Sequence, residues 1–165
     1  MMKKAVVVSM AVLVCLATFT YAQVGAKKAG DSRVETLLKE ADLTYTIDED
    51  GDFRLENDVG NGRTQLVWIL SNTSNLGSLE IRQVWSVAYR SKTPFSAEVA
   101  NRLLEVNSKV KLGSWQVREM GDEYVAVFSA QIAADTDRMS LLLAIHAVTT
   151  TADEIEKELT EKDDY

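Results

Sequence analysis

Two apolar segments separated by a short polar turn lie near the centre of the chain, and they constrain its fold more than any other feature. The first runs from Thr64 to Ser71 and the second from Leu79 to Arg90, with residues 72–78 between them. The second segment alternates as a half-buried β-strand does. Its apolar parity holds Leu79, Ile81, Trp85, Val87 and Tyr89, interrupted by Gln83, and its polar parity holds Glu80, Arg82, Ser86 and Arg90. The first segment is apolar on both parities, so the sequence predicts a central β-hairpin whose first strand lies deeper in the sheet.

The first 22 residues have the layout of a cleavable secretory signal. Lys3 and Lys4 precede an apolar run over residues 5–17 broken only by Ser9, and Thr20-Tyr21-Ala22 follows before Gln23. The apolar run is shorter than the roughly 20 residues that a membrane-spanning helix needs. We therefore expect residues 1–22 to be a signal peptide and the protein to be exported, either periplasmic or secreted, with no membrane attachment after cleavage.

The composition that remains after this cleavage bounds the fold and the partners. Cys15 is the only cysteine, and it follows Val14 where a lipoprotein signal has a small residue, which disfavours lipidation. Losing two lysines changes the net charge from −7 to −9 and leaves 143 residues. We expect a flexible leader over residues 23–30 and one domain over residues 31–165, stable without disulfides or metal. The acidic balance disfavours nucleic acid and anionic membranes as partners.

Two helices are predicted on either side of the central hairpin. The first begins at Ser32, with Glu35 three residues later as the second member of a capping box. The second follows Pro94 and runs to about Ser108, with apolar residues at helical spacing.

A third, longer helix is predicted from about Thr136 to about Thr160, capped by Asp135. Its apolar stripe, with spacings of three and four residues, indicates one face packed on the sheet. The run Thr149–Thr151 has low helix propensity, so a bend or fraying is expected there. Residues Asp153–Tyr165 carry seven acids and are expected to form a solvated end.

Four further strand patterns complete the chain, at Thr44–Asp48, Phe53–Glu56, Trp115–Arg118 and Tyr124–Ile132. Four strands, a helix and two strands favour a largely antiparallel sheet of about six strands, with the short segments Thr44–Asp48 and Trp115–Arg118 as its candidate edges. A calcium loop is the alternative for the acidic turn Asp48–Asp52. Its glycine lies between the second and third acids rather than after the third, and no Glu occupies the twelfth position, so a hairpin turn is preferred.

No group of residues has the spacing of a catalytic or metal site. His146 has no neighbouring histidine or acid in its helix, and nucleophilic schemes need a base beside a Ser or Cys. Paired carboxylates are the remaining option, but Glu80, Glu119 and Glu123 fall at positions predicted to face solvent or a turn. We therefore expect no catalytic residue, no cofactor and no metal.

Several segments resemble the YbjN family, also described as bacterial sensory transduction regulators. The similarity covers residues from about Val34 to about Leu159, and four segments carry it: Leu37–Tyr45, Asp50–Leu55, Gln65–Leu70 and Asn101–Trp115. The resemblance implies an α+β two-layer sandwich, in which a twisted antiparallel sheet is packed by three helices in the order α-β-β-β-β-α-β-β-α. It also implies a fold similar to type III secretion chaperones, frequent dimerisation, no known catalysis and no transferable functional residues. The export signal departs from a cytoplasmic chaperone role.

These observations predict an exported, non-enzymatic domain that binds a protein or peptide through a sheet face or helix groove. The alternative is a small-ligand carrier or sensor that uses Trp68, Trp85 and Trp115 as an aromatic pocket, although Trp68 and Trp85 lie in the apolar core pattern. A carboxylate-dependent hydrolase is the third option. Ile155 and Leu159 are predicted either to pack on the first helix or to form a weak homodimer contact.

Overall fold

The computed structural model describes residues 28–165, so the predicted signal peptide and most of the predicted leader lie outside the described residues. The elements are α1 Ser32–Glu40, β1 Thr46–Ile47, β2 Phe53–Gly60, β3 Arg63–Leu76, β4 Leu79–Ser91, α2 Ala97–Asn107, β5 Ser114–Met120, β6 Glu123–Ala133 and α3 Arg138–Thr160. The strands form one antiparallel sheet in the order β1-β2-β3-β4-β6-β5. This arrangement confirms the predicted α+β class, the element order and the two edge strands. No helix within residues 28–165 has the length and apolar character needed to cross a membrane.

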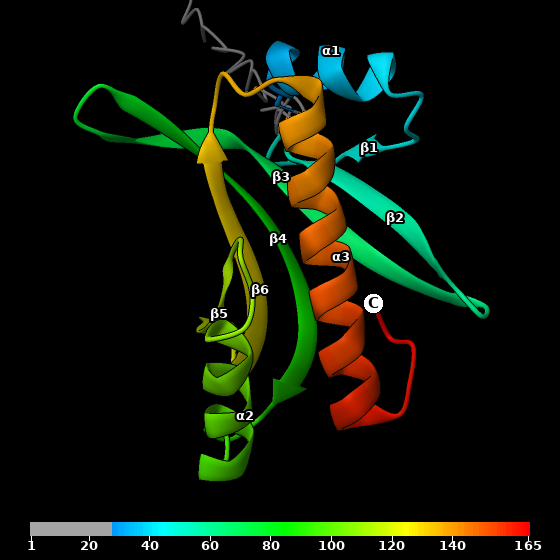
Figure 1. The fold of residues 1–165 in the computed structure, drawn as a ribbon, viewed down its shortest axis with the longest axis vertical. Helices are drawn as coiled ribbons and strands as arrows, with labels where there is room; N and C mark the ends of the chain where they lie inside the picture. Colours follow the sequence, from blue (N-terminus) through cyan, green and yellow to red (C-terminus); the bar gives the residue numbers. More distant parts are fainter. Residues whose placement is uncertain (1–27) are drawn as a thin grey trace, which may run out of the picture.

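The long helix α3 lies along one face of the sheet (Figure 1), where its apolar stripe and the inward side chains of the central strands form the main core. Buried core residues from the sheet include Phe53, Leu55, Val67, Ile69, Val84, Phe128 and Ala130. From α3 the core receives Leu141, Ala144, Val148, Ala152 and Ile155. Burial of this single continuous cluster supplies the main driving force for folding.

The predicted burial of β4 is wrong in its parity. Arg82, Val84, Ser86 and Ala88 are buried, and of the predicted apolar parity only Val87 is. Val84 belongs to the core with α3, whereas Trp85 is half-buried in a separate cluster with Val127. The polar parity can be buried because its polar side chains find partners, as in the hydrogen bond from Ser86 Oγ to Leu66 O. A shift of register between Val87 and Tyr89 then returns the ring of Tyr89 to the main core.

Both predicted helix caps are displaced. Asp31, not Ser32, is the N-cap of α1, and Asp137, not Asp135, is the N-cap of α3. In each case a carboxylate accepts a hydrogen bond from the first-turn backbone, and aspartate is as good an N-cap as serine.

The run of threonines does not interrupt α3, which is continuous through Thr149–Thr151. Thr149 is buried and accepts a hydrogen bond from Asn57 Nδ2 at 3.0 Å, and the hydroxyl of Thr150 donates to His146 O at 2.9 Å. Tertiary contacts therefore outweigh the poor helix propensity of threonine at this point.

The sheet is split between β3 and β4. Their pairing ends at Trp68 and Trp85, and the two strands diverge beyond that pair, β3 staying with β2 and β4 with β6 (Figure 1). Inside the split, the side chain of Gln65 takes the place of a backbone ladder by donating to Ser86 Oγ at 2.7 Å and to Val87 O at 2.8 Å. The first residues of β3 consequently present a strand edge in the interior of the sheet.

Candidate functional site

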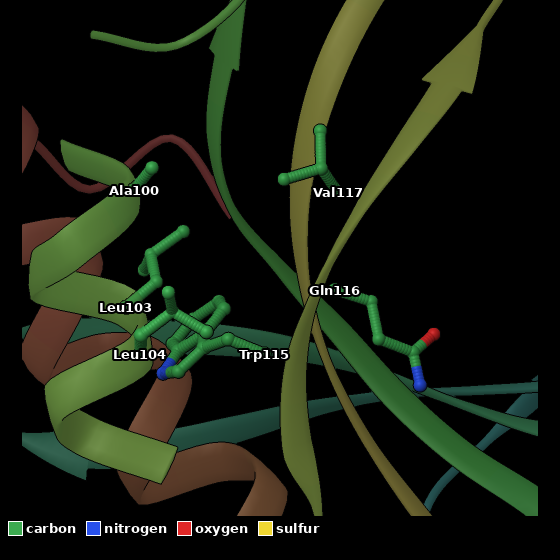
Figure 2. A pocket seen from close by; sticks show the side chains of 6 residues that line it. All are labelled: Ala100, Leu103, Leu104, Trp115, Gln116 and Val117. Carbon is green, nitrogen blue, oxygen red and sulfur yellow. The ribbon is translucent and has the colours of Figure 1, made fainter. Parts of the chain in front are cut away.

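An apolar cavity of about 170 Å³ lies between α2 and the edge strand β5 (Figure 2). It is lined by Ala100, Leu103, Leu104, Trp115, Gln116 and Val117. Leu103 and Trp115 are buried, while Leu104 and Val117 are 63% and 52% exposed. The cavity therefore has a fixed apolar floor and an accessible apolar rim, and we call it the α2–β5 groove.

The two walls of the α2–β5 groove are fixed to each other by the amide of Asn107. Its Oδ1 accepts a hydrogen bond from Trp115 N at 2.6 Å, which joins the last residue of α2 to the start of β5. The indole of Trp115 packs edge-on against Phe128 at 5.3 Å. Gly113, just before β5, has a φ of +89°, in the left-handed region that favours glycine, and an added Cβ would lie 2.7 Å from the Phe128 ring.

One side of β5 has no strand partner among the described residues. β5 pairs with β6 over its whole length and is the last strand of the sheet order. Alternate residues of a strand share a face, so Val117 and the exposed Glu119 follow Trp115 along the wall of the groove. The α2–β5 groove thus combines a free backbone edge with an apolar cavity and an acidic residue at its end.

The three tryptophans do not form a common pocket. Trp68 and Trp85 stack on each other at 5.0 Å with an interplanar angle of 18°, and the guanidinium of Arg118 lies 5.5 Å from the Trp85 ring. Trp85 packs with Val127, in the cluster on the face away from α3. Of the three, Trp115 alone belongs to the main core and lines the α2–β5 groove.

The predicted contact residues on α3 lie inward. Ile155 is buried in the main core, and Leu159 is half-buried against the same core. The first helix lies beside the opposite end of α3 (Figure 1), so these side chains are not placed on it. The burial of Ile155 leaves it no part in a surface contact of the folded chain.

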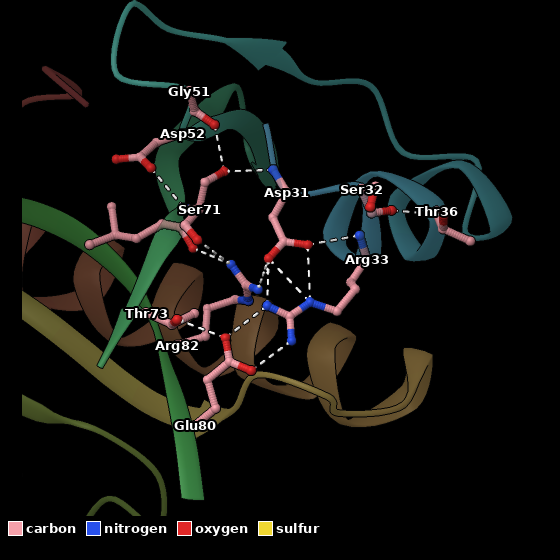
Figure 3. A network of polar contacts seen from close by, with 11 residues as sticks. Asp31, Ser32, Arg33, Thr36, Gly51, Asp52, Ser71, Thr73, Glu80 and Arg82 are labelled. Atoms are coloured by element: carbon pink, nitrogen blue, oxygen red, sulfur yellow. Dashed lines mark hydrogen bonds and ion pairs between the residues drawn. The ribbon is translucent and has the colours of Figure 1, made fainter. Parts of the chain in front are cut away.

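A buried arginine on β4 organises an extended polar group within the described residues (Figure 3). Arg82 is 1% exposed, and its Nη2 donates to Asp31 Oδ2 at 2.6 Å. Arg33 donates to the same carboxylate at 2.7 Å and to Glu80 at 2.8 Å and 2.9 Å, and Asp31 N donates to Ser71 Oγ at 2.9 Å. We call this group the Arg82 network, and it fastens the start of α1 to the central hairpin.

The carboxylates of the Arg82 network stay ionised. The hydrogen bonds from Arg33, against the opposing effect of burial and with help from Arg82, hold the pKa of Asp31 far below its usual range. Arg33 and then Thr73 lower the pKa of Glu80 to about 2. A general acid must carry a proton near neutral pH, so neither group is suited to that role. Glu80 was predicted to face solvent or a turn, and its carboxylate is partly exposed there while Arg33 binds it.

A second charged group lies where α3 ends. Glu156 is 0% exposed, and its Oε1 accepts the backbone N–H groups of Asp164 and Tyr165 at 2.5 Å and 3.1 Å. Arg63 contacts Asp153 at 2.7 Å and lies 3.7 Å from Glu156 Oε2, an oxygen with no hydrogen-bond partner among residues 28–165. We call this group the Glu156 cluster. Burial raises the pKa of Glu156, against the lowering effect of those N–H groups and of Arg63.

The Glu156 cluster has the ligand spacing of a cation site but already contains a cation. Carboxylate oxygens of Asp153, Glu156 and Asp163 lie within 4.8 Å of one another. The guanidinium of Arg63 lies 3.7 Å and 3.8 Å from the last two. The prediction of a solvated end over Asp153–Tyr165 therefore holds for the exposed Asp163 and Asp164 but is wrong for Glu156, which is buried where the cluster holds the end of the chain against β3.

Sequence reasoning missed both charged groups, because each joins residues far apart in the chain. Arg82 and Asp31 are 51 positions apart, and Arg63 and Asp153 are 90. No local pattern marked Arg82, because it lies on the parity of β4 that alternation assigns to solvent. Its partner could not be identified without the tertiary structure.

Comparisons with known proteins support the fold. No family model matches the sequence, and no curated protein matches it. Among solved structures, the chain is similar to the crystal structure of YbjN from E. coli, described as a candidate transcription regulator. The two are 9% identical in sequence, with a TM-score of 0.50 over 80% of this chain and 92% of that one. Identity this low reports the fold alone, and the chain has a YbjN-like fold.

Proposed function

We propose that this chain is an exported, non-enzymatic binding domain that captures an extended protein segment in the α2–β5 groove. The observation that carries the proposal is the combination of an open strand edge with an apolar cavity beside it. An added strand gains main-chain hydrogen bonds from a free edge, and alternate side chains that enter pockets supply specificity. The α2–β5 groove offers both features within seven residues of β5.

The chemistry of the groove defines the partner. Its lining is apolar apart from Gln116, so a large aliphatic or aromatic side chain of the partner fills it. Glu119 lies on the same face of β5 and has no ion-pair partner within residues 28–165. A basic residue two positions from the apolar one is therefore favoured, and the net charge of −7 favours basic partners in general.

A small-ligand carrier is the competing function, and the size of the α2–β5 groove favours a peptide side chain over a small ligand at that site. Sites for small molecules usually enclose about 300–1,000 Å³. The α2–β5 groove encloses about 170 Å³, which suits one inserted side chain better than a whole ligand. Trp68 and Trp85, which would have contributed to an aromatic pocket, pack on each other instead.

The test is selection of binders from a library of random linear peptides, followed by affinity measurements on chosen variants. Enriched peptides should share one large apolar residue and a basic residue two positions away. Leu104→Asp and Val117→Asp should each reduce affinity by about tenfold or more, because a charge at the rim opposes burial of the apolar side chain. Leu143→Asp is the matched control, since Leu143 is a 57% exposed leucine on α3.

Pairing with the β5 edge has a separate test. Methylating alternate backbone nitrogens of a selected peptide removes the donors that face β5, and binding should be lost for one set of alternate positions and kept for the other. The site would be rejected if methylation at the two alternate sets of nitrogens weakened binding equally. It would also be rejected if Leu104→Asp and Leu143→Asp lost the same affinity. A melting point raised by small molecules but by no peptide would favour the carrier function.

Export and the absence of catalysis are tested separately. Support for export comes from the pattern of residues 1–22, and fractionation of cells that express the full chain should find a product shortened at its N-terminus outside the cytoplasm. Support for a non-enzymatic role comes from the arginine-bound carboxylates of Asp31 and Glu80. Turnover of an ester, phosphate or glycoside, lost in a carboxylate-to-alanine variant, would overturn it.

A further inference from the structure

The split between β3 and β4 contains a strand edge that the chain covers with its own residues. The N–H groups of Thr64 and Leu66, two positions apart in β3, point away from β2 into the split. Thr64 N donates to Asp163 Oδ1 at 3.2 Å, and Leu66 N donates to Tyr165 O at 2.8 Å. Donors at alternate positions are what a strand edge offers to a neighbouring strand. Residues 163–165 therefore satisfy two donors of this strand edge, one through a side-chain carboxylate and one through a backbone carbonyl.

The side chain of Tyr165 completes this contact. Its ring packs with Val87, Val125 and Val127, the cluster on the face of the sheet away from α3. The guanidinium of Arg90 lies 5.7 Å from the ring centroid, within the range of a cation–π contact. The site inside the split therefore has three features: an apolar surface against the Tyr165 ring, the guanidinium of Arg90 beside that ring, and the two backbone N–H donors of β3.

We propose that the split between β3 and β4 is a second peptide-binding site, which accepts an extended segment with an acidic residue two positions before an aromatic residue and which residues 163–165 occupy in cis. The resident sequence Asp163-Asp164-Tyr165 defines this ligand class, because each recognised group has a named partner in the split. The site lies on different strands from the α2–β5 groove and does not depend on it.

Several structural features favour the release of residues 163–165 from the split. It is joined to α3 through Glu161, whose φ of +57° lies in the left-handed region that side chains adopt at an energetic cost. Asp163 and Asp164 are exposed. The carboxylate of Glu156, which holds the backbone of this segment, is buried with one oxygen lacking a hydrogen bond among the described residues. Release returns that carboxylate to water and relieves the strained residue.

The experiment uses the full chain with the double substitution Asp163→Ala and Tyr165→Ala, which removes both recognised groups. The probe is an acetylated, amidated peptide with the sequence Glu-Lys-Asp-Asp-Tyr, and the control peptide is Glu-Lys-Ala-Asp-Ala. The first peptide should shift the amide signals of Thr64 and Leu66 in heteronuclear NMR spectra, with a Kd on the order of 1 mM, since an untethered segment loses its effective concentration. The control peptide should cause no shift.

The native chain supplies the competition control. Its own segment occupies the site, so the peptide should need at least about tenfold higher concentration to produce the same shifts. A folded double variant that shows no shift with the peptide, or equal shifts with both peptides, would overturn the proposal.

A measurement on the native chain covers the case in which the double variant does not fold. Hydrogen exchange at the Leu66 amide should proceed by a local opening that is nearly independent of denaturant, whereas Ile69, in the fully paired part of β3, should exchange with global unfolding. If Leu66 exchanges only with global unfolding, the segment does not leave the split and the site cannot accept another ligand.

Discussion

The Arg82 network and the Glu156 cluster use the same kinds of side chain for the same task, and they respond to burial in opposite ways. Each fastens one end of the described chain to the central hairpin through a charged residue that is almost fully buried. In the Arg82 network the buried charge touches its counter-ion at 2.6 Å, and the pKa of Asp31 is lowered. In the Glu156 cluster the nearest guanidinium nitrogen is 3.7 Å away, and the pKa of Glu156 is raised.

The difference shows that a direct, hydrogen-bonded contact decides whether a buried charge is compensated. Desolvation disfavours both charges, and attraction offsets this cost only when the geometry is good and the remaining donors and acceptors are satisfied. Arg33 adds further hydrogen bonds to Asp31, while Glu156 Oε2 accepts none from the described residues. The start of α1 is therefore fixed firmly, and the segment after α3 is fixed loosely.

The largest effect is expected from Arg82→Met. Methionine has a similar length but leaves Asp31 without its buried partner and Leu70 O without its donor. Removing one member of a buried pair costs about 3–5 kcal/mol of unfolding free energy, which urea denaturation would measure. Arg54→Met is the control, because Arg54 is half-exposed on β2, and it should change stability by less than about 0.5 kcal/mol. Similar losses of stability in both variants would mean that Arg82 contributes no more to stability than a half-exposed arginine on the same sheet.

Asp31→Asn should cost less, about 2 kcal/mol, because it removes the charge and keeps an oxygen that can cap α1. Asp31→Ala removes the cap as well and should cost about 1 kcal/mol more. The same denaturation experiment checks both values. If the two variants were equally stable, the side chain of Asp31 would contribute to stability through its charge alone.

The dependence of stability on pH should separate the two groups further. A carboxyl group whose pKa is lowered in the folded state contributes stability that is present above its unfolded pKa and is lost as the pH falls. Asp31 and Glu80 start from 3.8 and 4.5 and are lowered, Glu80 to about 2, so native stability should fall between about pH 5 and pH 2. In Asp31→Asn this decline should be shallower. An identical decline in both proteins would assign the acid sensitivity to other carboxylates.

The sequence was sufficient for the features that depend on local periodicity. Alternation and turn residues predicted all six strands and their antiparallel pairing, and the short segments around Thr46 and Val117 were identified as edges. The burial prediction was wrong where a polar side chain is hydrogen-bonded to a distant partner. Ser86 and Arg82 were assigned to the solvent-facing parity and are buried. The α2–β5 groove was equally hidden, because the segment of α2 that lines it has the same apolar spacing as any helix that packs on a sheet.

The smallest effect, and the one that tests the comparison most directly, is expected from Glu156→Gln. Glutamine keeps an oxygen for the N–H groups of Asp164 and Tyr165 and removes the buried charge. The folded pKa of Glu156 is raised above its ordinary value of 4.5, so the native carboxyl contributes stability below that pH and loses it as the pH rises through the folded pKa. Relative to the native chain, the variant should gain stability between pH 4 and pH 7, with a difference at pH 7 below about 1 kcal/mol. Glu154→Gln, an exposed change on the same helix, is the control and should change stability by less than about 0.5 kcal/mol. A Glu156→Gln variant that becomes less stable than the native chain as the pH rises would show that Arg63 compensates Glu156 fully, and the contrast between the two groups would then be wrong.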